Sequence, residues 1–172
     1  MEASEPPATR VVLPAIVGKR CVKLARERYL HESIPCKSPQ CTRCTLPTTA
    51  LGSSTSLGAG ATHYLMPSAG MLLRFNEVLE LSNWTSIILL RSALAELPAR
   101  LQGALRRLAE DPKRHAIIFE DEHFAQTFQL VVPGERSIDR CDRSLAAAAR
   151  WYAEHLQGAV RIVVLAEAAQ PG

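Results

Sequence analysis

Three cysteines within nine residues are the first candidates for chemistry. Cys36, Cys41 and Cys44 form a C-x4-C-x2-C pattern. In an intracellular protein such a cluster binds metal more readily than it forms disulfides. Structural zinc takes four ligands, so a fourth must come from elsewhere in the chain, and the candidates are Cys21, Cys141 and the five histidines. The competing interpretation is three reduced, unligated thiols in a loop.

Composition excludes several classes of protein. Of the 172 residues, 47% are hydrophobic and 22% charged, which is typical of a water-soluble globule. The net charge of +3 is far below the basic excess of a protein held on nucleic acid by its phosphates alone. No apolar run approaches the roughly 20 residues that cross a bilayer, and residues 1–10 lack the layout of a secretory signal. We therefore expect an intracellular protein with no membrane partner.

The sequence divides into four segments that differ in composition and expected structure. The first is expected to be a tail and a hairpin, with an extended stretch at 11–17 and a second stretch at 21–30 that is either extended or a short helix. The second is the cysteine knot, the third a Gly/Ser/Thr-rich flexible linker loop, and the fourth an α/β domain. Their bounds are 1–35, 36–44, 45–62 and 63–172.

Apolar runs and helical patterns alternate in the fourth segment. Strands are expected at 63–66, 86–90, 115–119 and 160–165. Helices are expected at 71–81, 93–110 and 137–156. Pro98 lies in the first turn of the middle helix or divides it, and 124–132 is ambiguous. This alternation predicts a three-layer α/β domain, a parallel sheet flanked by helices, with chemistry beyond the carboxyl ends of the strands.

Three motifs together resemble one family. They are the cysteine knot, the segment Thr-His-Tyr-Leu-Met-Pro at 62–67, and the stretch from Asp-Arg-Cys-Asp-Arg at 139–143 to Trp-Tyr-Ala-Glu-His-Leu at 151–156. In this order they resemble the N-terminal region of the RNA exosome's processive ribonuclease, the Dis-three-like family. In that family a PIN nuclease domain precedes cold-shock modules and a ribonuclease-II-type 3′–5′ exonuclease domain. The residues of these motifs are more similar to those of the family's cytoplasmic paralogue, so we expect a cytoplasmic protein, with the nucleus as the alternative.

The resemblance implies a four-acid nuclease site that this chain has partly lost. Active PIN domains hold Mg²⁺ or Mn²⁺ between four carboxylates at the carboxyl edge of the sheet. The second and third acids match Glu96 and Asp142, whereas Ser68 and Ala168 stand at the first and fourth positions. With two of four anions missing, we predict that the domain is degenerate and is not a nuclease.

Two other interpretations of the acidic residues stay open. Asp121, Glu122 or Glu167 could substitute for a missing acid, although Glu167 lies one residue off register and alternation would point it to the opposite face. The remaining pair, Glu96 and Asp142, could instead serve only to stabilise helix N-termini through the helix dipole.

The resemblance also implies the fourth ligand of the knot. His155 would complete a Cys₃His zinc site with Cys36, Cys41 and Cys44. It follows Asp142 by 13 residues, about 20 Å along one helix, so this site would lie far from the acidic one. The neighbouring aromatic residues at 151 and 152 are expected to pack in the core and its rim rather than to stack on bases.

The expected function is docking. The hairpin, the knot and the adjoining sheet face would hold the ribonuclease against the core ring subunits of the exosome, so that threaded RNA reaches the exonuclease module. The family pattern continues with a helix and a strand after 165, so we expect a truncated PIN domain. The alternatives are an active metal-dependent endoribonuclease and a simple RNA-binding module that uses the basic residues between Lys19 and Arg28.

Overall fold

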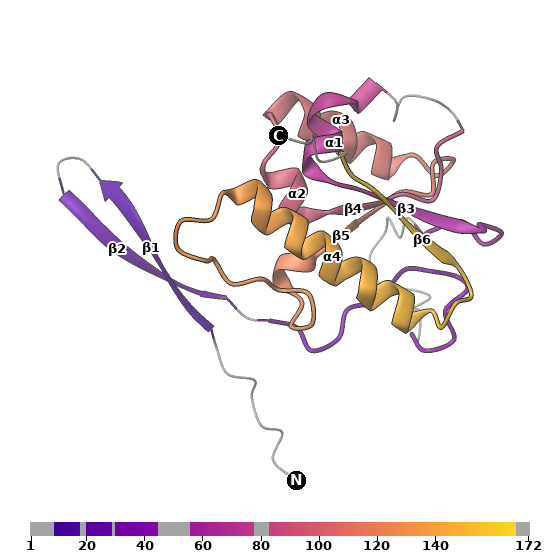
Figure 1. The fold of residues 1–172 in the computed structure, drawn as a ribbon, viewed down its shortest axis with the longest axis horizontal. Helices are drawn as coiled ribbons and strands as arrows, with labels where there is room; N and C mark the ends of the chain where they lie inside the picture. Colours follow the sequence, from indigo (N-terminus) through magenta and orange to yellow (C-terminus); the bar gives the residue numbers. More distant parts are fainter. Residues whose placement is uncertain (1–8, 18–19, 29, 45–55, 78–82, 168–172) are drawn as a thin grey trace, which may run out of the picture.

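A computed structural model describes residues 9–17, 20–28, 30–44, 56–77 and 83–167 (Figure 1). Most of the predicted linker loop, residues 45–55, and the position of Ala168 lie outside the described residues.

The centre of the fold is a parallel sheet. Strand β3 (His63–Pro67) pairs with β6 (Arg161–Leu165), and β4 (Ile88–Leu90) pairs with β5 (Ile117–Phe119), both in parallel. A parallel bridge between Leu65 and Ile87 joins the two pairs, which gives the order β6-β3-β4-β5. The predicted parallel sheet is confirmed.

Helices cover both faces of this sheet. Successive residues of the β4 segment alternate between two apolar clusters: Ile88 and Leu90 pack with α4 (Ser137–His155), whereas Ile87 and Leu89 pack with α3 (Ala99–Glu110). The short helices are α1 (Ala69–Arg74), α2 (Arg91–Ala95) and the 3₁₀ turn η2 (Asp121–His123). The fold is therefore the expected three-layer α/β arrangement, with α4 lying across one face (Figure 1).

Three elements differ from the expectation. Helix α1 ends at Arg74, with Phe75 as its C-cap, so it is shorter than the helix expected at 71–81, of which residues 78–81 lie outside the described residues. The helix expected at 93–110 divides at Pro98, which is extended at ψ 144° and precedes α3, so Glu96 caps the C-terminus of α2 instead of beginning a long helix. Strand β6, expected to be buried, is largely exposed because it lies at the edge of the sheet.

The ambiguous stretch 124–132 forms neither a helix nor a strand. The guanidinium of Arg143 holds its end, donating to the carbonyl of Leu130 and to the side chains of Gln129 and Glu135. No helix in the described part of the chain is long and apolar enough to cross a membrane.

The N-terminal hairpin is also confirmed. Strands β1 (Thr9–Val17) and β2 (Arg20–Arg28) pair antiparallel and extend away from the sheet as an arm (Figure 1). The arm joins the domain through His31, whose N–H donates to the carbonyl of His123 at 2.7 Å and whose carbonyl accepts from Ala125 at 3.0 Å. The sequence after the arm leads directly into the cysteine knot.

Candidate metal centre and the mouth of the sheet

The knot segment is fixed to the domain by two buried tyrosines. The hydroxyl of Tyr152, on α4, donates to the carbonyl of Cys36 at 3.1 Å. The hydroxyl of Tyr64, on β3, is hydrogen-bonded to Ser38 Oγ at 2.7 Å. Both tyrosines and the side chains of Cys36 and Ser38 are fully buried. The start of the knot is therefore part of the apolar core rather than a surface loop.

Four metal-binding atoms converge at the end of α4. The sulfurs of Cys36, Cys41 and Cys44 and a ring nitrogen of His155 all lie within 4.8 Å of one another. His155 Nε2 is 3.2 Å from Cys41 Sγ and 3.1 Å from Cys44 Sγ. Tetrahedral zinc, with bonds of about 2.3 Å to sulfur and about 2.0 Å to nitrogen, separates such atoms by about 3.5 Å. The two nitrogen–sulfur distances are a few tenths of an ångström shorter than this, and all four atoms lie within 4.8 Å, so the group can hold a metal ion such as zinc after small side-chain adjustments.

The surroundings favour the metal-binding forms of Cys41 and His155 but not that of Cys36. Burial raises the pKa of the Cys41 thiol, but the N–H groups of Cys44 and Arg43, each 3.3 Å from its sulfur, together with hydrogen bonds to the Cys36 and Cys44 side chains, outweigh this and lower it overall. Burial lowers the pKa of His155, and the positive charge of Arg43 adds to this effect, so the imidazole is kept neutral. Burial raises the pKa of Cys36 strongly, so metal binding would have to displace its proton.

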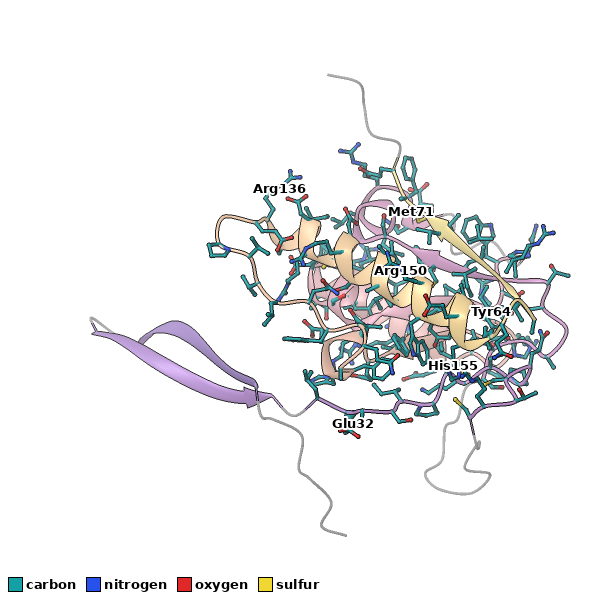
Figure 2. The ribbon with its side chains drawn as sticks, turned by 60° about the horizontal axis from the view of Figure 1, so that its bottom comes forward. Glu32, Tyr64, Met71, Arg136, Arg150 and His155 are labelled. Atoms are coloured by element: carbon teal, nitrogen blue, oxygen red, sulfur yellow. The ribbon has the colours of Figure 1, made fainter. Side chains whose placement is uncertain are left out.

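The predicted ligand set is thus brought together, and Cys141 is not part of it. The Cys141 thiol faces the carbonyl of Ser92 at 3.5 Å, in the core beside α2. Figure 2 shows His155 and Arg136 at opposite ends of α4, with Tyr64 on the side of His155. The metal centre and the mouth of the sheet are therefore separated by the length of this helix.

The mouth is a hollow at the carboxyl ends of β3 and β6. It has a volume of about 890 Å³, and its lining includes Ser68, Asp139, Asp142 and Glu167. Burial raises the pKa of Asp142, and the charges of Asp139 and Glu167 raise it further. The hollow therefore holds three carboxylates, two of which are paired with the guanidinium groups of Arg74 and Arg136 in its lining.

Neutral and paired groups occupy several of the predicted acidic positions. Ser68 Oγ accepts the N–H of Met71 at 3.1 Å and so caps α1. The carboxylate of Glu96 accepts the hydroxyl of Ser137 at 2.6 Å and is not part of the lining of the hollow.

Glu167 points into the hollow, unlike the expectation that it would face away. The strand β6 ends at Leu165, so strict alternation does not extend to this residue. Its carboxylate forms an ion pair with Arg74 Nε at 2.9 Å and packs against Gly70, where a Cβ would lie 3.3 Å from it.

The other two proposed substitutes lie outside the lining of the mouth. Asp121 is fully buried, and its carboxylate accepts the backbone N–H of Ser92 at 3.1 Å as well as the Ser92 hydroxyl. Glu122 lies 4.0 Å from Arg140. Within the described ranges, the Cys/His group is the one place where three or more ligating side chains converge; the carboxylates of the mouth do not.

Two functional contacts were not anticipated from the sequence. The indole of Trp151 stacks on the imidazole of His155, and the Tyr64 hydroxyl anchors Ser38. The spacing of Trp151 and His155, four residues apart on one helix, is the signal that could have revealed the first contact. The second depends on the folded position of β3 and has no local signal.

Comparison with known proteins places the chain beside exosome nucleases. No protein-family profile matches it. It is 32% identical over 146 residues to the exosome complex exonuclease RRP44 of Mus musculus, covering 79% of this chain and 15% of that protein. The RRP44 of Homo sapiens is 31% identical over the same shares. The exosome complex exonuclease dis3 of Schizosaccharomyces pombe is 30% identical over 174 residues, 92% of this chain and 18% of that protein.

A solved structure gives the fold. The PIN domain of T. brucei RRP44 superimposes with a TM-score of 0.65 at 24% identity, covering 78% of this chain and 80% of that one. The chain spans less than a fifth of the length of the curated exonucleases that it matches. Over that part, it is homologous to the exosome exonucleases RRP44 and Dis3, and its fold is that of the PIN domain.

Proposed function

We propose that this chain is the N-terminal docking region of an exosome-associated 3′–5′ exoribonuclease, and that it holds the enzyme on the exosome core instead of cleaving RNA itself. RNA that threads through the core ring would then reach an exonuclease module elsewhere in the enzyme. We also propose that the protein acts in the cytoplasm, with the nucleus as the alternative.

The convergence of the Cys₃His group carries the docking proposal. It links residues 36–44 to His155 at the end of α4, and the same segment leads back through His31 to the hairpin arm. Zinc bound here would brace the base of the arm against the sheet. A braced arm loses less conformational freedom on binding, which strengthens association with a partner.

The state of the mouth supports the absence of nuclease activity. Metal-assisted phosphodiester hydrolysis needs several oxygen ligands around Mg²⁺ or Mn²⁺. Here Ser68 contributes a hydroxyl that already caps a helix, Glu96 is held by Ser137, and Glu167 is paired with Arg74. Asp142 is left with fewer anionic partners than a tight divalent-ion site requires.

Reconstitution with the exosome core tests the docking proposal. The zinc-loaded chain and its Cys41→Ser and Cys141→Ser variants are titrated against the purified core. We expect Cys41→Ser to lose affinity and Cys141→Ser to retain it, because only Cys41 belongs to the metal group. Equal affinity of all three proteins would show that the knot is not a docking element.

A second candidate function is residual endoribonuclease activity. Asp139 and Glu167 line the same hollow as Asp142, and after burial their charges raise its pKa; a bound cation would relieve this repulsion between carboxylates. Incubation of the chain with a circular RNA in Mn²⁺ tests it. Cleavage that disappears in both Glu96→Gln and Asp142→Asn would establish this activity, and an intact circle would support docking alone.

A further inference from the structure

The imidazole of His155 is oriented by ring stacking. Its ring lies over the indole of Trp151, with centroids 4.6 Å apart and planes inclined by 20°. A metal-binding histidine is usually oriented by a hydrogen bond from its other ring nitrogen to a carboxylate or carbonyl. Among the residues that the structure describes, the hydrogen bonds of His155 run only from Nε2 to the two cysteine sulfurs. Within this described part of the chain, an aromatic surface takes the place of the usual orienting partner.

That surface is rigid. Trp151 is only 9% exposed, and Phe119 stacks on it at 5.3 Å and 26°. Phe124 and Tyr152 meet it edge-on at 5.0 and 4.8 Å. With neighbours of this kind the indole cannot change rotamer without opening the core.

The geometry points to Trp151 as the positioning residue of the metal centre: its indole holds the His155 ring with Nε2 directed at the cysteine sulfurs. This inference rests on the metal centre proposed above. Because both residues lie on α4 four positions apart, one helix carries both the ligand and the surface that orients it.

Metal affinity of the full chain tests the role of Trp151. Co²⁺ is titrated into the metal-free protein, its thiolate absorption is followed, and Zn²⁺ is measured by competition. We expect Trp151→Leu, which keeps an apolar side chain but loses the flat surface, to bind roughly 10- to 100-fold more weakly. Trp151→Phe, which keeps a smaller ring, should fall between this variant and the unaltered chain.

Phe124→Leu is the matched control. Phe124 belongs to the same buried cluster and contacts Trp151 but not His155. We expect it to lower the free energy of unfolding while leaving metal affinity unchanged. An equal loss of metal affinity in Phe124→Leu and Trp151→Leu would overturn the inference, since affinity would then follow general stability.

A spectroscopic measurement separates positioning from packing. The chain has two tryptophans, so in Trp84→Phe the emission comes from Trp151 alone. We expect this emission to change when metal is added to Trp84→Phe. In the double variant that also carries His155→Ala, metal addition should leave the emission unchanged.

The outcomes distinguish the inference from the proposal on which it rests. Unchanged affinity in both Trp151 variants, or in Trp151→Phe if Trp151→Leu does not fold, overturns the positioning role alone. Failure of the unaltered chain to bind metal overturns the metal centre and the positioning role together.

Discussion

Loss of the histidine ligand should abolish the stabilisation of the fold by zinc. Three of the four ligands lie within residues 36–44, so the unfolded chain retains them as a local site. The fourth, His155, is 111 residues from Cys44 and reaches the others only in the folded state. Zinc bound at the proposed centre would therefore favour folding mainly through the affinity that His155 adds.

The size of the effect follows from mass action. If the histidine makes zinc bind the folded state about 100-fold more tightly than the unfolded state, saturating zinc stabilises the fold by about 2.7 kcal/mol. For a chain of this length, 1 kcal/mol corresponds to a change in Tm of about 2–4 °C. We expect zinc to raise the Tm of the unaltered chain by about 5–11 °C, and to raise that of His155→Ala by far less.

Thermal melts followed by circular dichroism, with chelator or with zinc, measure this shift. Cys141→Ser serves as the control, because its thiol is buried away from the metal group, and its shift should match that of the unaltered chain. A zinc-induced shift in His155→Ala as large as in the unaltered chain would refute the reasoning.

Three further predictions concern buried polar side chains. Burial raises the pKa of Asp121 above its usual value of about 3.9. Protonation of Asp121 therefore stabilises the folded state; this stabilisation is complete below a pH of about 3.9 and is lost as the pH rises through the raised pKa. Asp121→Asn should lack this decline in urea titrations across pH, and a difference from the unaltered chain that stays constant with pH would contradict it. Tyr152→Phe leaves the buried carbonyl of Cys36 without its donor, which should cost about 1–3 kcal/mol in urea unfolding; an unchanged midpoint would contradict this. Ser68→Ala removes the cap of α1 and should cost about 1 kcal/mol, whereas Ser68→Asp, which can also cap, should restore most of it; equal stability of the two variants would rule out the capping role.

Local patterns in the sequence were sufficient for most of the fold. The apolar run at 86–90 predicts a strand buried on both faces, because only a central strand of a covered sheet can bury consecutive side chains, and β4 is buried throughout. The exposure of β6 was not predictable in the same way. Its run of Val and Leu resembles that of a central strand, whereas its edge position depends on which strands lie beside it in the folded sheet.

The candidate sites likewise include residues that a local pattern predicts and residues that it does not. The spacing of Cys36, Cys41 and Cys44 is local and predicts a metal site by itself, whereas His155 was found only through the family resemblance, because no local rule connects residues so far apart. The direction of Glu167 depends on where β6 ends and on the ion pair with Arg74, neither of which is encoded in a periodic pattern.

The separation of the ligands along the chain also determines when the metal centre can be completed during synthesis. The three thiols leave the ribosome early and can capture an ion, while the imidazole follows after more than a hundred further residues have been translated. A nascent chain would thus carry a metal ion with one coordination position filled by water or a borrowed ligand until α4 emerges. Binding of His155 to the ion would then mark the moment at which α4 docks on the sheet.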